Sequence, residues 1–126
     1  MSGSLDHGTV RVERRSGAPW LVIAEGDHDV TTNAAFERAL AQCGDTDIAL
    51  DFSGATFVDS SVVGLLLRHA GAGRGRVAVV SPRDTPPRRV FDLIALDRTL
   101  PVFDSLQAAE RAPADSWIAT SAESET

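Results

Sequence analysis

The first part of the chain shows the alternation of apolar and polar positions that is typical of strands. Val10 and Val12 alternate with polar neighbours across residues 9–14, and a denser apolar run follows at residues 20–23. Residues 16–19, Ser-Gly-Ala-Pro, carry a turn signal between the two segments. The pattern therefore predicts a hairpin of two strands.

The next segment changes to helical spacing. It starts after Thr31 or Thr32, which are both good N-cap residues, and it ends at Gly44. Its apolar positions recur every three or four residues, at Ala35, Phe36, Ala39, Leu40 and Cys43. We predict an amphipathic helix here.

A short buried strand and a second helix follow. The apolar run at residues 48–52 predicts the strand, and we expect a loop from there to Asp59 that contains Ser53, Gly54 and Thr56. Beyond Asp59, apolar residues almost surround the axis of a helix at residues 60–70. A helix that is apolar on most sides belongs at the centre of a domain.

The remaining elements alternate in the same way. The glycine-rich residues 71–75 end the second helix, and residues 77–80 predict the next strand. Thr85 followed by Pro86 opens a third helix. Its expected inward stripe consists of Val90, Phe91, Ile94 and Ala95.

The C-terminal part predicts one more strand and one more helix. Residues 101–103 form the short strand, and Asp104 caps a final helix that runs to about Arg111. Strands alternating with helices predict a single α/β domain with a mixed sheet of about four to five strands and about four helices.

Composition sets the bounds of this domain and limits its chemistry. The chain has 126 residues, 43% of them hydrophobic, which suits one domain with a real core. We expect the domain at residues 9–111, a flexible N-terminus at residues 1–8 and an acidic, flexible tail at residues 112–126. Whether Trp117 in this tail packs on the domain stays open.

Charge and cysteine content exclude several functions. The net charge is −6 and every basic residue is an arginine, so lysine-based catalysis is excluded and nucleic acid is a poor partner. The longest apolar run, residues 20–24, is far shorter than a membrane-spanning helix, and the start of the chain does not resemble a signal peptide. We expect a cytoplasmic protein with no membrane insertion, no cofactor and no metal.

Two groups of residues invite a functional interpretation that their context does not favour. Residues 71–75 follow a helix and precede a strand, the reverse of a phosphate-binding loop, so a helix end and a turn are favoured. Asp27, His28 and Asp29 are metal-ligand types, but neighbours in one turn rarely converge on an ion, so a solvated turn is favoured. Asp29 is alternatively a surface acid used by a partner.

A serine hydrolase is not favoured either. Ser60 and His69 lie nine residues apart on one predicted helix, about 13 Å along its axis, and cannot share a hydrogen bond. His28 is the remaining candidate base, and nothing in the sequence argues for it.

The strongest candidate site is Asp59-Ser60-Ser61, at the start of the central helix. These residues are good N-caps, which stabilise a helix by about 1 kcal/mol, and this is the interpretation that local chemistry favours. A hydroxyl here also suits a switch, because a phosphate would gain from the helix dipole and add about −1.5 to −2 charges to the surface.

The segment LDFSGATFVDSSVVGLLLRHA, which contains this motif, resembles the STAS domain of bacterial anti-sigma factor antagonists. GDHDVTTNAAFERAL and VAVVSPRDTPPRRVFDLIALDRTLPVFDSLQAA resemble the flanking parts of that fold in order, so the resemblance covers residues 9–111. It implies a regulator without enzymatic activity. Its partner would be an anti-sigma factor with a GHKL-type kinase fold.

The resemblance also implies the roles of individual residues. The kinase would phosphorylate Ser60, and a metal-dependent phosphatase would remove the phosphate. The unphosphorylated form would bind the anti-sigma factor and so free a sigma factor, whereas the phosphorylated form would not bind. The implied partner-binding residues are Asp29, Asp59, Ser60, Ser61 and Val62.

The sequence departs from the family at one position. Val62 stands where the family usually has glycine, and its β-branched side chain is expected to hinder a kinase. This favours an alternative, a non-phosphorylated STAS accessory subunit of a transporter or of a signalling complex. One example would be a subunit that contacts the ATPase of a lipid transporter.

Overall fold

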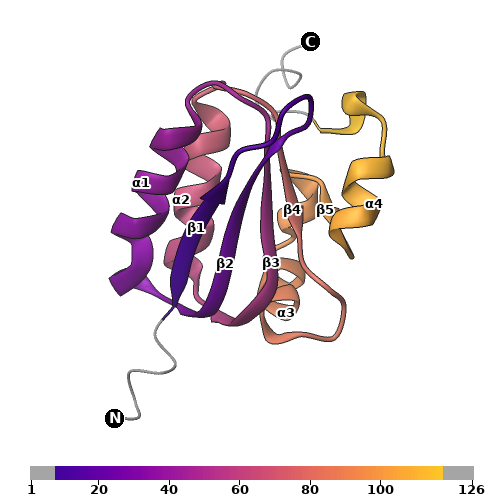
Figure 1. Cartoon of the computed structure of the whole chain (residues 1–126). Coiled ribbons are helices and arrows are strands. Elements are labelled where there is room, and N and C mark those ends of the chain that lie inside the picture. The colour runs from indigo at the N-terminus through magenta and orange to yellow at the C-terminus, as the bar shows by residue number, and fades with distance from the viewer. Residues whose placement is uncertain (1–7, 118–126) are drawn as a thin grey trace.

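The computed structural model describes residues 8–117, so most of the predicted flexible ends, residues 1–7 and 118–126, lies outside the described residues. Within the described part, a five-stranded mixed sheet has the order β1-β2-β3-β4-β5 (Figure 1). β1 is antiparallel to β2, and the other neighbours are parallel. The predicted α/β fold class is confirmed.

The bounds of the elements follow the chain order. The strands are β1 (Thr9–Glu13), β2 (Trp20–His28), β3 (Ile48–Val58), β4 (Val77–Val80) and β5 (Val102–Phe103). The α-helices are α1 (Asn33–Cys43), α2 (Ser60–Gly71), α3 (Pro86–Leu93) and α4 (Leu106–Arg111). Short 3-10 turns are η2 (Val30–Thr32), η3 (Leu96–Arg98) and η4 (Ala114–Ser116).

β3 is longer than its sequence pattern predicts. The prediction of a loop after Phe52 is wrong, because β3 continues to Val58 and stays paired with β2, with two register shifts on the way. Gly54 fits this pairing, since a Cβ there would lie 2.9 Å from Cγ of Glu25 on the neighbouring strand. Pairing across the sheet therefore extends a segment whose local signals favour a loop.

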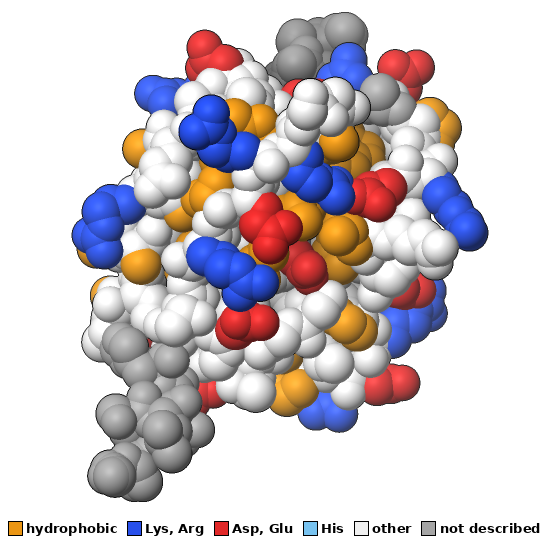
Figure 2. Space-filling model, viewed as in Figure 1, with side chains coloured by type: hydrophobic (Ala, Val, Ile, Leu, Met, Phe, Trp, Pro, Cys, Tyr) orange, Lys and Arg blue, Asp and Glu red, His pale blue; other side chains and the backbone are white. Residues whose placement is uncertain are grey.

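Helices cover the two faces of the sheet unequally. α1 and α2 lie to the left of the sheet in Figure 1 and pack into the main core, whereas α4 lies to its right and buries Ala109 in a second apolar cluster. The front of β1 and β2 is solvated, with Arg11 bridging to Glu25 at 3.1 Å, and Figure 2 shows charged and apolar side chains interspersed there. None of the helices within residues 8–117 is long and apolar enough to cross a bilayer.

α2 forms the centre of the main core, as predicted. Its buried residues are Val62, Val63, Leu65, Leu66 and Ala70. It ends at Gly71, and Gly73 adopts a φ of +69° in the following turn, so the glycine cluster acts as a helix end and a turn.

The inward stripe of α3 differs from the prediction. Pro87 and Phe91 are buried, Val90 is partly buried, and Ile94 is 42% exposed. The reason is that α3 ends at Leu93, and Ala95 turns the chain with a left-handed φ of 56°. Just beyond this turn, Leu96 and Leu100 are buried.

Asp104 is not the cap of α4. Ser105 occupies that position, and its Oγ accepts a hydrogen bond from the N–H of Ala108 at 3.0 Å. Asp104 instead accepts from Arg88 Nη1 at 2.8 Å and from Arg83 Nε at 3.0 Å. Asp104 was predicted as the cap because it and Ser105 are both good capping residues. The ion pairs that engage Asp104 come from distant segments and leave no local signal in the sequence.

Trp117 packs on the domain. It is 4% exposed, its indole N–H donates to the carbonyl of Ala109 at 3.2 Å, and its ring contacts Phe103. Residues 112–117, which the sequence analysis placed in the tail, thus continue the fold.

Replacing Ala95 by glycine is expected to stabilise the protein. A left-handed conformation costs a residue with a Cβ about 1–2 kcal/mol, and glycine adopts it freely. After the added entropy of the unfolded chain, Ala95→Gly should raise the free energy of unfolding by about 0.5–1 kcal/mol in urea titrations. Ala72→Gly, at a position with a φ of −74°, is the control and should lower it. A loss of stability in both variants would contradict the assignment.

The Asp104 cluster predicts a pH dependence of stability. Hydrogen bonds from Arg88, followed by those from Arg83, lower the pKa of the Asp104 carboxyl. Its contribution is therefore complete above the ordinary carboxyl pKa of about 3.9 and is lost as the pH falls through the lowered value. Asp104→Asn should reduce the free energy of unfolding at pH 7, and the difference from wild type should shrink below about pH 4. Asp97→Asn, on η3, should show no such trend; equal profiles for the two variants would refute the prediction.

Candidate functional site

Asp59 caps the central helix as the sequence predicts. Its Oδ1 accepts from the backbone N–H of Ser61 at 2.9 Å and from the Ser61 hydroxyl at 2.6 Å. Both bonds turn the Ser61 side chain back toward Asp59. Ser60, between them, is the first residue of α2.

Asp29 builds a second turn with the same pattern. It caps η2, and its Oδ1 accepts from the N–H of Thr31 at 2.9 Å and from the Thr31 hydroxyl at 2.5 Å. We call residues 29–31 and 59–61 the twin caps. In each, an aspartate binds the residue two positions later, and the residue between them is exposed.

The sheet brings the twin caps together. His28 and Val58 are partners in the β2–β3 register, and the N–H of Asp59 donates to the carbonyl of His28 at 3.2 Å. Neighbouring strands lie about 4.8 Å apart, so the two aspartates follow strand ends separated by roughly that distance. The structure thus unites Asp29 and Asp59, which the sequence separates by thirty positions.

The Ser60 hydroxyl is accessible. The residue is exposed, and no group within residues 8–117 hydrogen-bonds to its side chain. It lies at the N-terminus of a twelve-residue helix, where free backbone N–H groups and the helix dipole favour a negative charge. A phosphate on this oxygen would be stabilised by its carrier.

Val62 does not belong to the surface. Its exposure is 0%, and it packs in the main core, so the prediction that it contacts a partner is wrong. Two residues along a helix correspond to about 200° of rotation, which turns Val62 to the side opposite Ser60. The departure from the family's usual glycine therefore does not crowd the acceptor hydroxyl.

His28 is also buried, which corrects the prediction of a solvated turn. Its Nδ1 lies 3.0 Å from Thr32 Oγ1 and its Nε2 lies 2.9 Å from the carbonyl of Glu25, while Phe36 packs edge-on against the ring. Both ring nitrogens are engaged in this way, so His28 does not serve Ser60 as a base. Gly8 permits this packing, because a Cβ there would lie 2.6 Å from Cε1 of His28.

The remaining candidate groups do not add to the site. Asp27, the neighbour of His28, accepts from the Thr56 hydroxyl, and no group of three His, Cys, Asp or Glu residues in the described part of the chain is arranged to hold a metal. His69 is partly buried near the end of α2. Burial and the nearby Arg74 lower its pKa.

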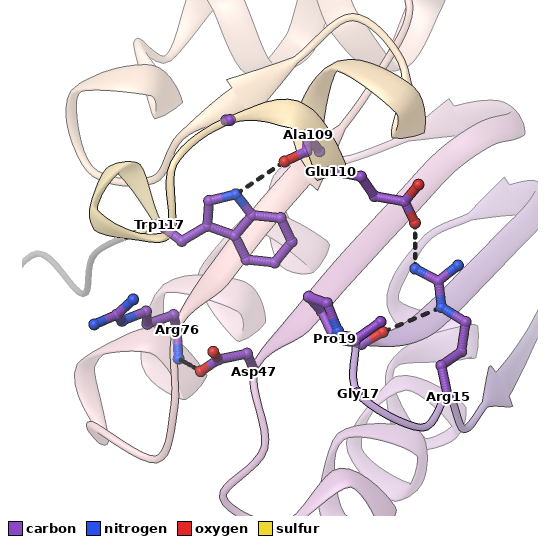
Figure 3. A pocket seen from close by; sticks show the side chains of 10 residues that line it. Arg15, Gly17, Pro19, Asp47, Arg76, Ala109, Glu110 and Trp117 are labelled. Atoms are coloured by element: carbon purple, nitrogen blue, oxygen red, sulfur yellow. Dashed lines mark hydrogen bonds and ion pairs between the residues drawn. The ribbon is translucent and has the colours of Figure 1, made fainter.

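A cavity of about 480 Å³ lies at the opposite end of the sheet, where no sequence pattern indicates a site (Figure 3). It lies between the β1–β2 turn, the segments that precede β3 and β4, and the C-terminal part of the domain. Arg15 donates to Glu110 and to the carbonyl of Pro19 along its rim, and Trp117 forms a wall. Because β2 and β3 point away from it, the cavity is remote from the twin caps.

Comparisons with known proteins agree with this geometry. The chain resembles an anti-sigma factor antagonist from Mycobacterium paratuberculosis, with 25% identity and a TM-score of 0.68 over 85% of this chain and 97% of that one. It also resembles the Bacillus cell fate determinant SpoIIAA in its phosphorylated form, with 26% identity and a TM-score of 0.54 over 82% and 98% of the two chains.

A putative antagonist from Thermotoga maritima shares the fold, with 21% identity and a TM-score of 0.61 over 82% of this chain and 95% of that one. A comparison with curated proteins gave no match. Residues 3–104 match the family model described as "Mlab, STAS domain". Because this match spans most of the sequence, the chain belongs to the STAS domain family.

Proposed function

We propose that the protein is an anti-sigma factor antagonist whose binding is switched off by phosphorylation of Ser60. The observation that carries the proposal is the accessible Ser60 hydroxyl at the start of a helix whose body is buried. Similarity to antagonists, including SpoIIAA, which has been solved in both its unphosphorylated and its phosphorylated form, supports it.

The binding surface in this proposal is the twin-cap edge. Asp29, Asp59, Ser60 and Ser61 would face the anti-sigma factor, and complex formation would release a sigma factor. The partner would be a kinase of the GHKL type, and a metal-dependent phosphatase would reset Ser60. The antagonist, the kinase and the phosphatase would all act in the cytoplasm.

The switch works through a difference in affinity. A phosphate gains from the N-terminus of α2 in the free protein, whereas in the complex it would be pressed against a surface that fits a hydroxyl. A cost of about 3 kcal/mol to the complex weakens binding by more than a hundredfold. Folding of the carrier need not change.

Substitutions of Ser60 test this mechanism. With the cognate anti-sigma factor, Ser60→Ala should bind like wild type and lose phosphorylation, because it removes only the acceptor oxygen. Ser60→Asp should raise the Kd by about a hundredfold in calorimetric titrations. Ser16→Asp adds the same charge in the exposed β1–β2 turn and should bind like wild type.

Two results would contradict the proposal. Equal affinities of Ser60→Ala and Ser60→Asp would show that charge at this position does not control binding. Incubation with candidate anti-sigma kinases and ATP, followed by mass spectrometry, should place the phosphate on Ser60; an unmodified Ser60 and no binding to any of them would refute the function itself.

A second candidate is a non-phosphorylated accessory subunit of a transporter or signalling complex. The matching family model, described as "Mlab, STAS domain", does not name an antagonist, so the family is compatible with this candidate too. In the sequence, Val62 favours this candidate because its side chain is expected to hinder a kinase at Ser60. The burial of Val62 removes that argument. Copurification with an ABC ATPase in place of an anti-sigma kinase would decide for the accessory subunit.

A further inference from the structure

Large apolar side chains are exposed at few places in the described part of the chain. They are Val30 at 67%, Phe57 at 45%, Leu93 at 86% and Ile94 at 42%. Val30 belongs to the first of the twin caps, and Phe57 lies two residues before the second. Half of this exposed apolar set thus borders the Ser60 site.

Val30 is held outward by the cap around it. Asp29 binds both the N–H and the hydroxyl of Thr31, so the turn is fixed and the residue between them projects to solvent, as Ser60 does in the second cap. The carbonyl of Val30 accepts from the N–H of Asn33, and Thr32 donates to the carbonyl of Asp29, so the turn uses the backbone of Val30 and not its apolar side chain. A polar residue would satisfy the turn equally well, so folding does not require a valine here.

Phe57 is exposed for a related reason. Successive residues of a strand point to opposite faces, and Val58 points into the main core. Phe57, opposite Asp27 in the register, therefore points away from the main core in which Val58 packs. Aromatic rings in such positions are enriched among the residues that dominate the energy of protein interfaces.

The charges around these side chains restrict what can cover them. Asp27, Asp29 and Asp59 are partly buried carboxylates along the same edge, and the whole chain carries a net charge of −6. A second copy of this chain would bring like charges together, which is unfavourable. The fitting occupant is a protein surface with an apolar groove bordered by basic side chains.

We infer that Val30 and Phe57 are the apolar anchors that dock the anti-sigma factor on the twin-cap edge; this inference rests on the proposed function. The anchors supply affinity, and Ser60 in the second cap supplies control. A phosphate introduced beside an apolar contact would have to be desolvated for the complex to form, which makes the switch effective.

The test compares three exposed positions in binding to the anti-sigma factor that the wild-type protein recognises. Val30→Ser and Phe57→Ser should each raise the Kd by about tenfold or more, and the double variant by more than either. Leu93→Ser makes the same kind of change on α3 and should stay within about twofold of wild type. Because all three side chains are exposed, the melting temperatures should be nearly unchanged, which separates lost binding from lost folding.

The outcomes separate the anchors from the switch. If Val30→Ser and Phe57→Ser bind like wild type while Ser60→Asp does not, the anchors are wrong and the proposed function stands. If the anchor variants lose affinity while Ser60→Asp and Ser60→Ala bind alike, the anchors stand and the switch fails. An equal loss in Leu93→Ser overturns the assignment to this edge.

The choice of occupant has its own test. Sedimentation should show that the wild-type protein is monomeric at the concentrations used for binding. A dimer that Val30→Ser or Phe57→Ser dissociates would identify a second copy as the occupant and overturn the inference. Failure of the wild-type protein to bind any anti-sigma factor would overturn it as well.

Discussion

The site depends on the long parallel pairing of β2 with β3. β4 accompanies only the first four residues of β3, so the half of β3 that leads to Ser60 is held in the sheet by β2 on one side. The buried ring of His28 holds the end of that pairing in place, because its two nitrogens contact the Thr32 hydroxyl and the Glu25 carbonyl. A slip of one residue would turn every side chain of the strand to the opposite face and separate the twin caps.

α2 combines two tasks at different positions along its length. Its body lies in the core through Val62, Val63 and Leu66, which stabilise the domain, while its first residue reaches the surface. A change at Ser60 therefore alters the surface at a position that contributes little packing. In the proposed switch, this separation would let a charged group regulate binding while the same helix continues to support the fold.

Features set by neighbouring residues could be predicted from the sequence, and features set by pairing across the sheet could not. The hairpin, the central helix and the Asp59 cap follow from turn residues, apolar periodicity and a carboxylate next to free N–H groups. The full length of β3, the burial of His28 and the docking of Trp117 depend on segments far away in the chain. The burial of Val62 follows from its helical phase, about 200° from Ser60, which its place in the family motif does not indicate.

The most direct test of the account compares amide hydrogen exchange in the protein with serine and with phosphoserine incorporated at position 60. The account predicts altered exchange only at the twin caps and unchanged protection from Val62 to Ala70, because the phosphate changes the surface and leaves the core of α2 intact. Loss of protection throughout α2 would contradict it, since the phosphate would then act by unfolding its own carrier.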